Sequence, residues 1–278
     1  IIELGAGSGE MMSQILKTID NFKKFKSSSK FFIHEKSAYL KKTQKYKIQK
    51  YNVKWIDNLN KISNYPSIFI ANEFFDSLPI KQFIKKKNNW FERFIHSKDK
   101  KLLILDVKTR KKIIEKMIKL KIDNNEKFIE YSPLAFKKLN IISKIVRKNN
   151  GGVLIIDYGY NKEKMFDTLQ SVKNHKKNNF LENIYQSDIT HMLNFHYYKK
   201  KIKKMKLGYI KLTSQREFLI NMGILKRAEI ISKNVSFSKK ADIYFRLKRL
   251  IDKKEMGLLF KVLFATKKRN NNPILGFK

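Results

Sequence analysis

The spacing of apolar side chains changes at a glycine-rich turn near the start of the chain. Residues 1–4 form a short, mostly apolar run, and the turn Gly5-Ala6-Gly7-Ser8-Gly9 follows it. From residue 11 to residue 19 the apolar side chains recur with the period of an amphipathic helix. This order predicts a strand, a tight turn and a helix.

The same alternation continues to the end of the chain. Short apolar runs predict further strands at residues 30–34, 51–56, 67–71, 153–157, 208–213 and 258–266. Helical spacing predicts helices at residues 37–44, 110–121, 132–148, 188–205 and 215–252. In the helix that starts at Ser132, the serine is the expected cap and Pro133 the first helical residue. Between residues 80 and 105, short strands with lysine and asparagine turns predict antiparallel hairpins. Strands that alternate with helices are typical of an α/β fold with a mainly parallel sheet and helices on both faces.

The chain begins with Ile1, without an initiator methionine and already inside an apolar run. We therefore expect a fragment that lacks its N-terminus, so that any targeting segment would lie in the missing part. No linker-like composition and no internal repeat divides the sequence. This predicts a single domain over residues 1–278, with inserts at about 80–125 and 214–253.

The formal net charge of +38 raises the possibility of a nucleic-acid partner. Of the 62 basic residues only eight are arginine and the other 54 are lysine, spread along the whole chain. Lysine, asparagine and isoleucine are abundant together, which indicates a compositional bias rather than a concentrated binding patch. We therefore expect a solvated basic surface and no specific nucleic-acid partner.

Composition also excludes other classes of protein. Apolar runs stop at about four residues, whereas a membrane-spanning helix needs about 20. Cysteine is absent, which rules out disulfides, thiolate catalysis and cysteine-ligated zinc. The five histidines show no metal-binding spacing with acids, and His191 and His196 do not share a helix face well. We therefore predict no metal site.

The glycine turn after the first strand and the acidic residues that end the second and third strands together outline an adenosyl-binding site. The glycines of the turn, Gly5, Gly7 and Gly9, allow a ligand to approach the backbone at a helix N-terminus, although a plain tight turn would use them as well. Glu35 ends the second strand, where a carboxylate can bind both ribose hydroxyls. Asp57 ends the third strand and could accept from an adenine amino group or be a surface turn residue.

The segment Asn72-Glu73-Phe74-Phe75-Asp76-Ser77-Leu78-Pro79 ends the fourth strand. Two carboxylates, Glu73 and Asp76, could neutralise a cationic substrate there, and their geometry suits a guanidinium group. Alternatively, both phenylalanines are core residues and Glu73 is an acid at a helix start. The segment is not the Asp/Asn-Pro-Pro-aromatic motif of DNA amino-methyltransferases, because the prolines are missing.

These segments together resemble the MidA-type S-adenosyl-L-methionine (SAM)-dependent methyltransferases, the family of a mitochondrial complex I assembly factor and its proteobacterial relatives. The resemblance covers essentially the whole chain and is carried by the following segments in family order: Glu3 to Gly9, Ala71 to Pro79, Trp90-Phe91-Glu92, Gly151-Gly152 to Gly159, Asp167 to Val172 and Met256 to Leu263. It implies a class I Rossmann-like core with inserted segments and SAM as the cofactor. In this pattern Glu3, Gly5, Gly7, Gly9, Glu35, Asp57 and Asn72 would bind the cofactor. One departure is Asn194, where relatives usually carry an acid.

The resemblance also implies a function. The mitochondrial member of the family is a protein arginine methyltransferase that acts on a core subunit of complex I, so we expect methyl transfer to a protein arginine, with Glu73 and Asp76 as catalytic residues. The expected partner is a protein substrate, possibly a complex I core subunit. An RNA or DNA base methyltransferase, or an assembly chaperone that binds SAM without turnover, are the alternatives. The expected location is the cytoplasm of a bacterium, or the mitochondrial matrix in a eukaryote; the oligomeric state is not predicted.

Overall fold

The computed structural model describes residues 1–62, 64–99, 101–174, 176–268 and 273–277. The chain divides into two compact units, which are described separately. The first comprises residues 1–74, 139–159 and 199–278, and the second comprises residues 75–138 and 160–198. The chain therefore enters and leaves the second unit twice. The predicted insert at 80–125 belongs to the second unit, whereas the predicted insert at 214–253 belongs to the first.

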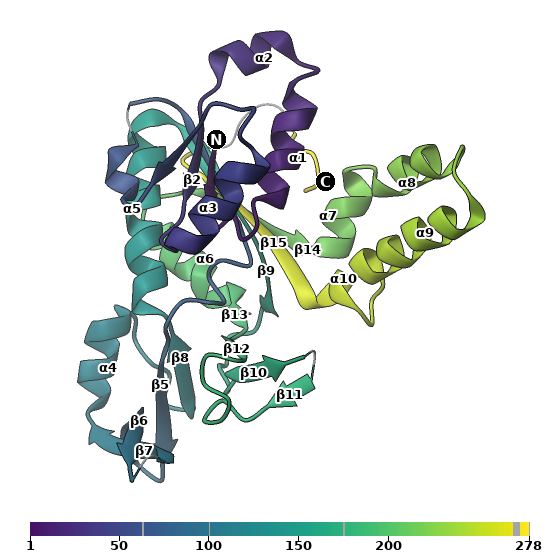
Figure 1. The fold of residues 1–278 in the computed structure, drawn as a ribbon. Coiled ribbons are helices and arrows are strands. Elements are labelled where there is room, and N and C mark those ends of the chain that lie inside the picture. Colours follow the sequence, from purple (N-terminus) through teal and green to yellow (C-terminus); the bar gives the residue numbers. More distant parts are fainter. Residues whose placement is uncertain (63, 100, 175, 269–272, 278) are drawn as a thin grey trace. The chain divides into compact units, whose positions relative to one another are not determined.

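The first unit (Figure 1) is built on a mixed sheet, in which a path of seven strands runs from β14 to β3. Four neighbouring pairs, from β9 to β3, are parallel, and β15 and β14 continue the sheet with antiparallel pairing. The strands, in their order across the sheet, are β14 (Tyr209–Ser214), β15 (Phe260–Thr266), β9 (Gly151–Tyr160), β4 (Ser67–Asn72), β1 (Ile2–Leu4), β2 (Phe31–His34) and β3 (Val53–Ile56).

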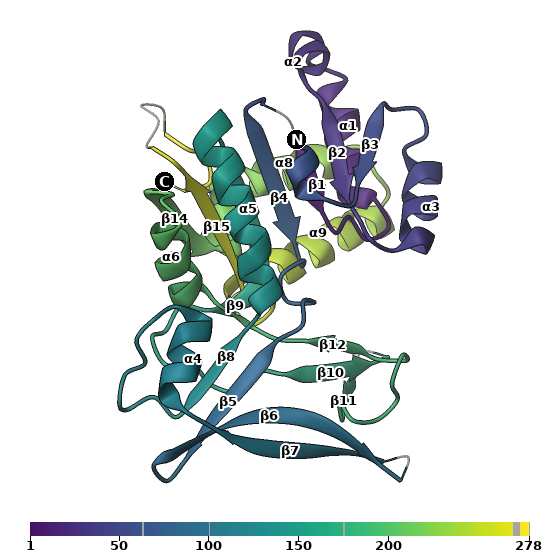
Figure 2. The ribbon, with the colours of Figure 1, turned by 90° about the vertical axis from the view of Figure 1, so that its left-hand side faces the viewer.

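Both faces of this sheet are covered. The three consecutive residues of β1, Ile2, Glu3 and Leu4, are 1%, 2% and 0% exposed, although neighbouring side chains in a strand point to opposite faces. Figure 2 shows α5 in front of the sheet. The helices that belong wholly or partly to this unit are α1 (Glu10–Ile19), α2 (Lys23–Ser28), α3 (Ala38–Lys47), the 3-10 turn Leu59–Lys61, α5 (Pro133–Asn149), α6 (Phe195–Lys204), α7 (Gln215–Asn221), α8 (Ile224–Ser232), α9 (Phe237–Ile251) and α10 (Met256–Leu259). The predicted class I Rossmann-like architecture is confirmed.

The second unit contains two antiparallel sheets. Four strands follow one another in the order β7 (Lys101–Thr109), β6 (Asn89–Lys98), β5 (Lys81–Lys86) and β8 (Phe128–Tyr131). Helix α4 (Lys111–Ile118) lies between β7 and β8 in the chain. Three shorter strands follow in the order β11 (Lys176–Asn178), β10 (Gln170–Lys173) and β12 (Asp188–Thr190), and β13 (Leu193–Asn194) comes directly before α6.

The predicted helix over residues 188–205 is wrong in its first part. Asp188–Thr190 is the strand β12, paired with β10, and the helix begins only at Phe195. The side chain of Asn194 accepts a hydrogen bond from the amide of Tyr197, 3.0 Å away, as an N-terminal cap does. This cap fixes the start of the helix and gives Asn194 a structural role.

Two other helix boundaries test the sequence prediction. The last predicted strand, 258–266, starts too early, because Leu258 and Leu259 belong to the short helix α10. The predicted start of α5 is confirmed, since the Ser132 hydroxyl accepts from the amide of Ala135 at 3.1 Å.

No helix within the described ranges combines the length and the apolar character that a membrane crossing requires. Among the same residues, no three histidines or acids lie close enough together to hold a metal ion.

Candidate cofactor site

The glycine turn joins β1 to α1 in a backbone conformation that favours glycine. Gly5, Gly7 and Gly9 have φ values of 64°, 50° and 83°, all in the left-handed region. A Cβ atom on Gly5 would lie 2.7 Å from the ring of Phe74, so only glycine fits there. A Cβ atom on Gly7 would meet nothing within 4 Å. The turn therefore leaves open space beside Gly7, next to the N-terminus of α1.

Glu3 lies in β1, just before this turn, and its carboxyl has a raised pKa. The residue is 2% exposed, and its Oε2 has no hydrogen-bond partner among the described atoms. Burial raises the pKa of the Glu3 carboxyl from 4.5 to about 7, although the backbone amide of Met12 partly opposes this by bonding to the carboxylate. Near neutral pH the carboxyl is therefore present in both forms.

Glu35 follows β2 and is held by its own backbone. Its Oε1 accepts hydrogen bonds from the amides of Lys36 and Ser37, at 2.8 and 2.9 Å. Its Oε2 accepts from Nε2 of Gln44, at 3.1 Å. Three donors fix the carboxylate, so the side chain is oriented before any ligand binds.

Gln44 connects the glycine turn to Glu35, a role that the sequence analysis missed. The residue lies on α3 and is fully buried. Its Nε2 also donates to the carbonyl of Gly7, at 2.8 Å, and its Oε1 accepts from the indole of Trp55, at 2.9 Å. One amide group thus joins the turn after β1, the acid after β2 and an aromatic residue of β3. A polar residue on the inner face of a helix is the only sequence signal that could have indicated this.

We expect Gln44→Leu, which keeps the volume but removes three hydrogen bonds, to weaken SAM binding about tenfold. Unpaired buried groups at Gly7 and Trp55 should also lower the free energy of unfolding by about 2 kcal/mol. Calorimetry and urea unfolding measure the two effects. Because Gln44 acts on the ligand through Glu35, the combination with Glu35→Gln should lose less binding energy than the sum of the single changes. Additive losses would contradict this link.

Asp57 follows β3 at the same edge of the sheet. It is exposed and pairs with Lys41, with 2.5 Å between Oδ1 and Nζ. The hydrogen bond from Lys41 lowers the pKa of the Asp57 carboxyl. Because β1, β2 and β3 are parallel neighbours, their carboxyl ends bring the glycine turn, Glu35 and Asp57 to one edge. The contact of Asp57 with an adenine stays a prediction.

Asn72 ends β4, the strand next to β1, and Glu73 follows it directly. Glu73 has a φ of 46°, which is uncommon for a residue with a side chain, and its amide donates to the carbonyl of Ile156 at 2.9 Å. The side chain of Glu73 is exposed, and its Oε1 accepts from Nδ2 of Asn72 at 3.4 Å. Strain of this kind persists where the surrounding structure enforces it, often at functional sites.

The next three residues of this segment, Phe74, Phe75 and Asp76, are buried. Phe74 packs against His34 in the first unit, and Phe75 packs against Tyr198 in the second, so the two aromatic residues are core residues. Asp76, in the second unit, is 4% exposed, and its backbone carbonyl accepts from the amide of His191. Burial lowers the pKa of His191 to about 4, so this histidine is neutral near pH 7. The catalytic roles of Glu73 and Asp76 stay predictions.

The segment that begins with Asp167 holds a polar network inside the second unit. Asp167 accepts from Arg93 at 2.7 Å and from Gln82 at 2.8 Å. The hydroxyl of Thr168 donates to the buried carboxyl of Glu130, which also accepts from Gln82 at 2.7 Å. Each of these contacts lies within one unit, so they give the segment a structural role there.

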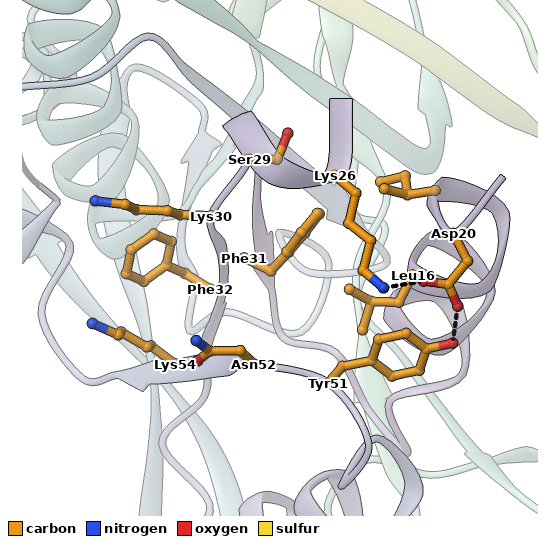
Figure 3. A pocket seen from close by; sticks show the side chains of 11 residues that line it. Leu16, Asp20, Lys26, Ser29, Lys30, Phe31, Phe32, Tyr51, Asn52 and Lys54 are labelled. Carbon is orange, nitrogen blue, oxygen red and sulfur yellow. Dashed lines mark hydrogen bonds and ion pairs between the residues drawn. The ribbon is translucent and has the colours of Figure 1, made fainter. Parts of the chain in front are cut away.

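A pocket of about 270 Å³ lies at the opposite ends of β2 and β3 (Figure 3). Asp20, at its wall, accepts from Lys26 and from the hydroxyl of Tyr51, both at 2.7 Å. Phe31 and Asn52, at the beginning of the strands, also line it. Because the glycine turn, Glu35 and Asp57 follow the carboxyl ends of their strands, this pocket is separate from the candidate cofactor site.

Comparison with known proteins gives a family-level match over three quarters of the chain. The profile of a family described as "Putative S-adenosyl-L-methionine-dependent methyltransferase" matches residues 1–210. This range includes all the predicted cofactor residues.

Curated relatives match at low identity. The following three, like other curated relatives, are named protein arginine methyltransferase NDUFAF7, or its homolog, mitochondrial. The Danio rerio protein is 25% identical over 94% of this chain and 67% of its own length. The Caenorhabditis elegans protein is 27% identical over 82% and 58%, and the Xenopus laevis protein 25% identical over 100% and 71%. The chain thus spans between about half and three quarters of these relatives.

A solved structure from Burkholderia thailandensis, described as a COG1565 superfamily member bound to S-adenosyl-homocysteine, has the same fold. Its TM-score is 0.79 at 20% identity, covering 99% of this chain and 72% of that one. A second structure from the same organism gives a TM-score of 0.78 at 19% identity, covering 99% and 75%.

Proposed function

The chain belongs to this family of SAM-dependent methyltransferases, and we propose that it transfers the methyl group to an arginine side chain of a protein. One structural observation carries the proposal. Glu73, an exposed carboxylate, is held at a φ of 46° at the end of β4, the strand next to the glycine-turn strand β1. A carboxylate at this sheet edge is suited to binding a guanidinium group.

The residues at the sheet edge fit SAM as a cofactor. The turn leaves open space beside Gly7, and Glu3 offers a buried oxygen without a partner among the described atoms. Glu35 is already oriented, as a ligand for ribose hydroxyls would need to be. We propose that these residues hold the cofactor together with Gly5, Gly9, Asp57 and Asn72. When bound, SAM supplies a methyl group on a positively charged sulfur.

The chain's own residues would contribute mainly positioning. Methyl transfer from a sulfonium needs little acid–base catalysis, so the rate depends on aligning the attacking nitrogen. We propose that Glu73 binds the guanidinium group and keeps its charge away from that nitrogen, while the catalytic role of Asp76 stays a prediction. Asn72, whose side chain reaches Glu73, would help to orient the carboxylate.

The names of the relatives support the substrate class. They are called protein arginine methyltransferases, and the family's link to complex I leads us to propose a complex I core subunit as the substrate. The proposed compartment is the mitochondrial matrix in a eukaryotic host and the cytoplasm in a bacterial one. The lysine-rich surface is spread over the chain and gives no specific support to a nucleic-acid substrate.

Labelled SAM distinguishes the three possible functions. The full-length protein is incubated with labelled SAM and either cell proteins or purified nucleic acid, and hydrolysed products are separated. We expect label in methylarginine, and none with Gly7→Val, which should block cofactor binding. Label in nucleic acid would instead show a base methyltransferase. SAM binding in calorimetry without any transfer would indicate a chaperone.

A further inference from the structure

The edge strand β7 leaves its apolar side chains exposed. In the four-stranded sheet β7 is at one end of the order, and among the residues that the structure describes its pairing partner is β6 alone. Leu103, Leu105 and Val107 alternate along it and therefore share one face. They are 49%, 47% and 45% exposed, so the second unit does not bury them.

The neighbouring strand extends this exposed surface. Phe94, opposite Leu105 in the β6–β7 pair, is 43% exposed on the same face. On the other face, Ile95 and Ile104 are opposite one another and are 50% and 45% exposed. The hairpin, seen in Figure 2, thus carries apolar side chains on both faces. We call the group Phe94, Leu103, Leu105 and Val107 the β7 patch.

An exposed apolar edge strand is a template for another strand. Its outward backbone N–H and C=O groups can pair with an extended segment, while its side chains form pockets for alternate residues of that segment. Proteins usually protect such edges with charges or bulges near the centre. In β7 the middle of the strand is apolar, from Leu102 to Leu105, and the lysines are near its ends.

The charges around the β7 patch select the partner. Lys101 and Lys108, near the two ends of β7, are exposed and form no ion pair within the described part of the chain. Two acids of the hairpin are paired, Asp106 with Lys86 at 2.8 Å and Glu92 with Lys81, while Asp99 lies exposed in the turn between β6 and β7. An incoming segment therefore meets Lys98 and Lys101 beside Asp99 at one end of β7 and Lys108 near the other, which is a net positive charge at both ends. A second copy of this chain would bring the same lysines and a net charge of +38, so it fits poorly.

We propose that β7 binds an extended segment of the protein substrate by adding it as a further strand to the sheet. In this segment every second residue is apolar and packs beside the β7 patch. Acidic residues near its two ends pair with Lys101 and Lys108. The identification of the partner as the substrate rests on the proposed function, whereas the docking surface itself does not. It assigns substrate recognition to a surface remote in sequence from the cofactor residues.

A synthetic peptide tests the docking surface directly. The probe is a fluorescent peptide of alternating valine and threonine with glutamate at both ends, and the matched probe has lysine in place of glutamate. We expect the full chain to bind the acidic peptide at least tenfold more tightly than the basic one, by anisotropy. Hydrogen exchange should slow at the amides of β7 when the acidic peptide is bound.

Paired variants separate apolar from charged recognition. Leu103→Thr with Leu105→Thr keeps strand-forming residues and should weaken binding about tenfold. Lys101→Glu with Lys108→Glu should reverse the preference toward the basic peptide. Ile189→Thr on β12 and Lys177→Glu on β11, both exposed positions of the same unit, should change nothing. Circular dichroism checks that each variant folds.

Each outcome decides the proposal. Equal binding of both peptides, or no slowing of exchange at β7, would overturn it. Dimerisation that the β7 variants abolish would assign the surface to a second copy, and binding to anionic phosphatidylglycerol vesicles in place of the peptide would assign it to a membrane. Methyl transfer that is unaffected by the β7 variants would leave the proposed function intact and refute substrate docking. Peptide binding without any methyl transfer would support docking at β7 and refute the proposed function.

Discussion

Replacing Glu73 with glutamine should lower the rate of methyl transfer about a hundredfold or more. Glutamine keeps the shape of the side chain but removes the charge that we propose binds the guanidinium group. A preorganised charge at a reacting centre contributes on this scale, because it acts without reorganisation at the moment of reaction. The rate is measured with labelled SAM at a saturating cofactor concentration.

SAM affinity should change little in the same variant, and so should stability. Glu73 is exposed, so it has no desolvation cost that the substitution could relieve. Glu229→Gln serves as the control, since it removes an exposed carboxylate from α8 of the same unit. If Glu73→Gln abolishes SAM binding but leaves the rate per bound cofactor intact, Glu73 belongs to the cofactor site. The arginine assignment would then rest on the relatives alone.

The parallel strands were predictable because both faces of their sheet are buried. Such strands are short, continuous apolar runs, and β4 and β9 have this pattern. Strands β8, β10, β11 and β12 were missed, since they are short and depend on partners elsewhere in the chain. For example, Phe128 pairs with Ile84, which is distant in the sequence. Local spacing carries no information about such pairing.

In the candidate site, the positions of the acids at strand ends could be predicted from the sequence, but the contacts between side chains could not. Glu35 and Asp57 follow strands, and the sequence indicates where strands end. Gln44 contacts the carbonyl of Gly7, 37 residues away, and no local pattern indicates a contact of that kind. The division into two compact units has no signal in the sequence, because the chain passes between the units without linker-like composition. The burial of Glu3 depends on how α1 packs over β1, which only the structure reveals.

Glu3 should make the protein less stable as the pH rises from about 4.5 to about 7. The folded state raises the pKa of this carboxyl to about 7, whereas the unfolded chain keeps the ordinary value of 4.5. Between these two values the folded state binds more protons than the unfolded state, so stability falls with rising pH. The shift corresponds to about 3 kcal/mol, which is fully lost above about pH 8.

Glu3→Gln isolates this contribution, because glutamine is neutral at every pH and keeps the shape of the side chain. Urea unfolding of both proteins at pH 4.5 and pH 8 gives four free energies of unfolding. Between pH 4.5 and pH 8, the free energy of unfolding of the variant should rise by about 3 kcal/mol relative to that of the wild type. Other titrating groups, including the buried Glu130, are common to both proteins and cancel in this comparison. If the free energies of unfolding of variant and wild type differ by the same amount at both pH values, folding does not raise the pKa of Glu3. The carboxyl would then be ionised in the folded protein without destabilising it. The buried carboxyl would then need a cation or donor beside it, and its place in the cofactor site would have to be reconsidered.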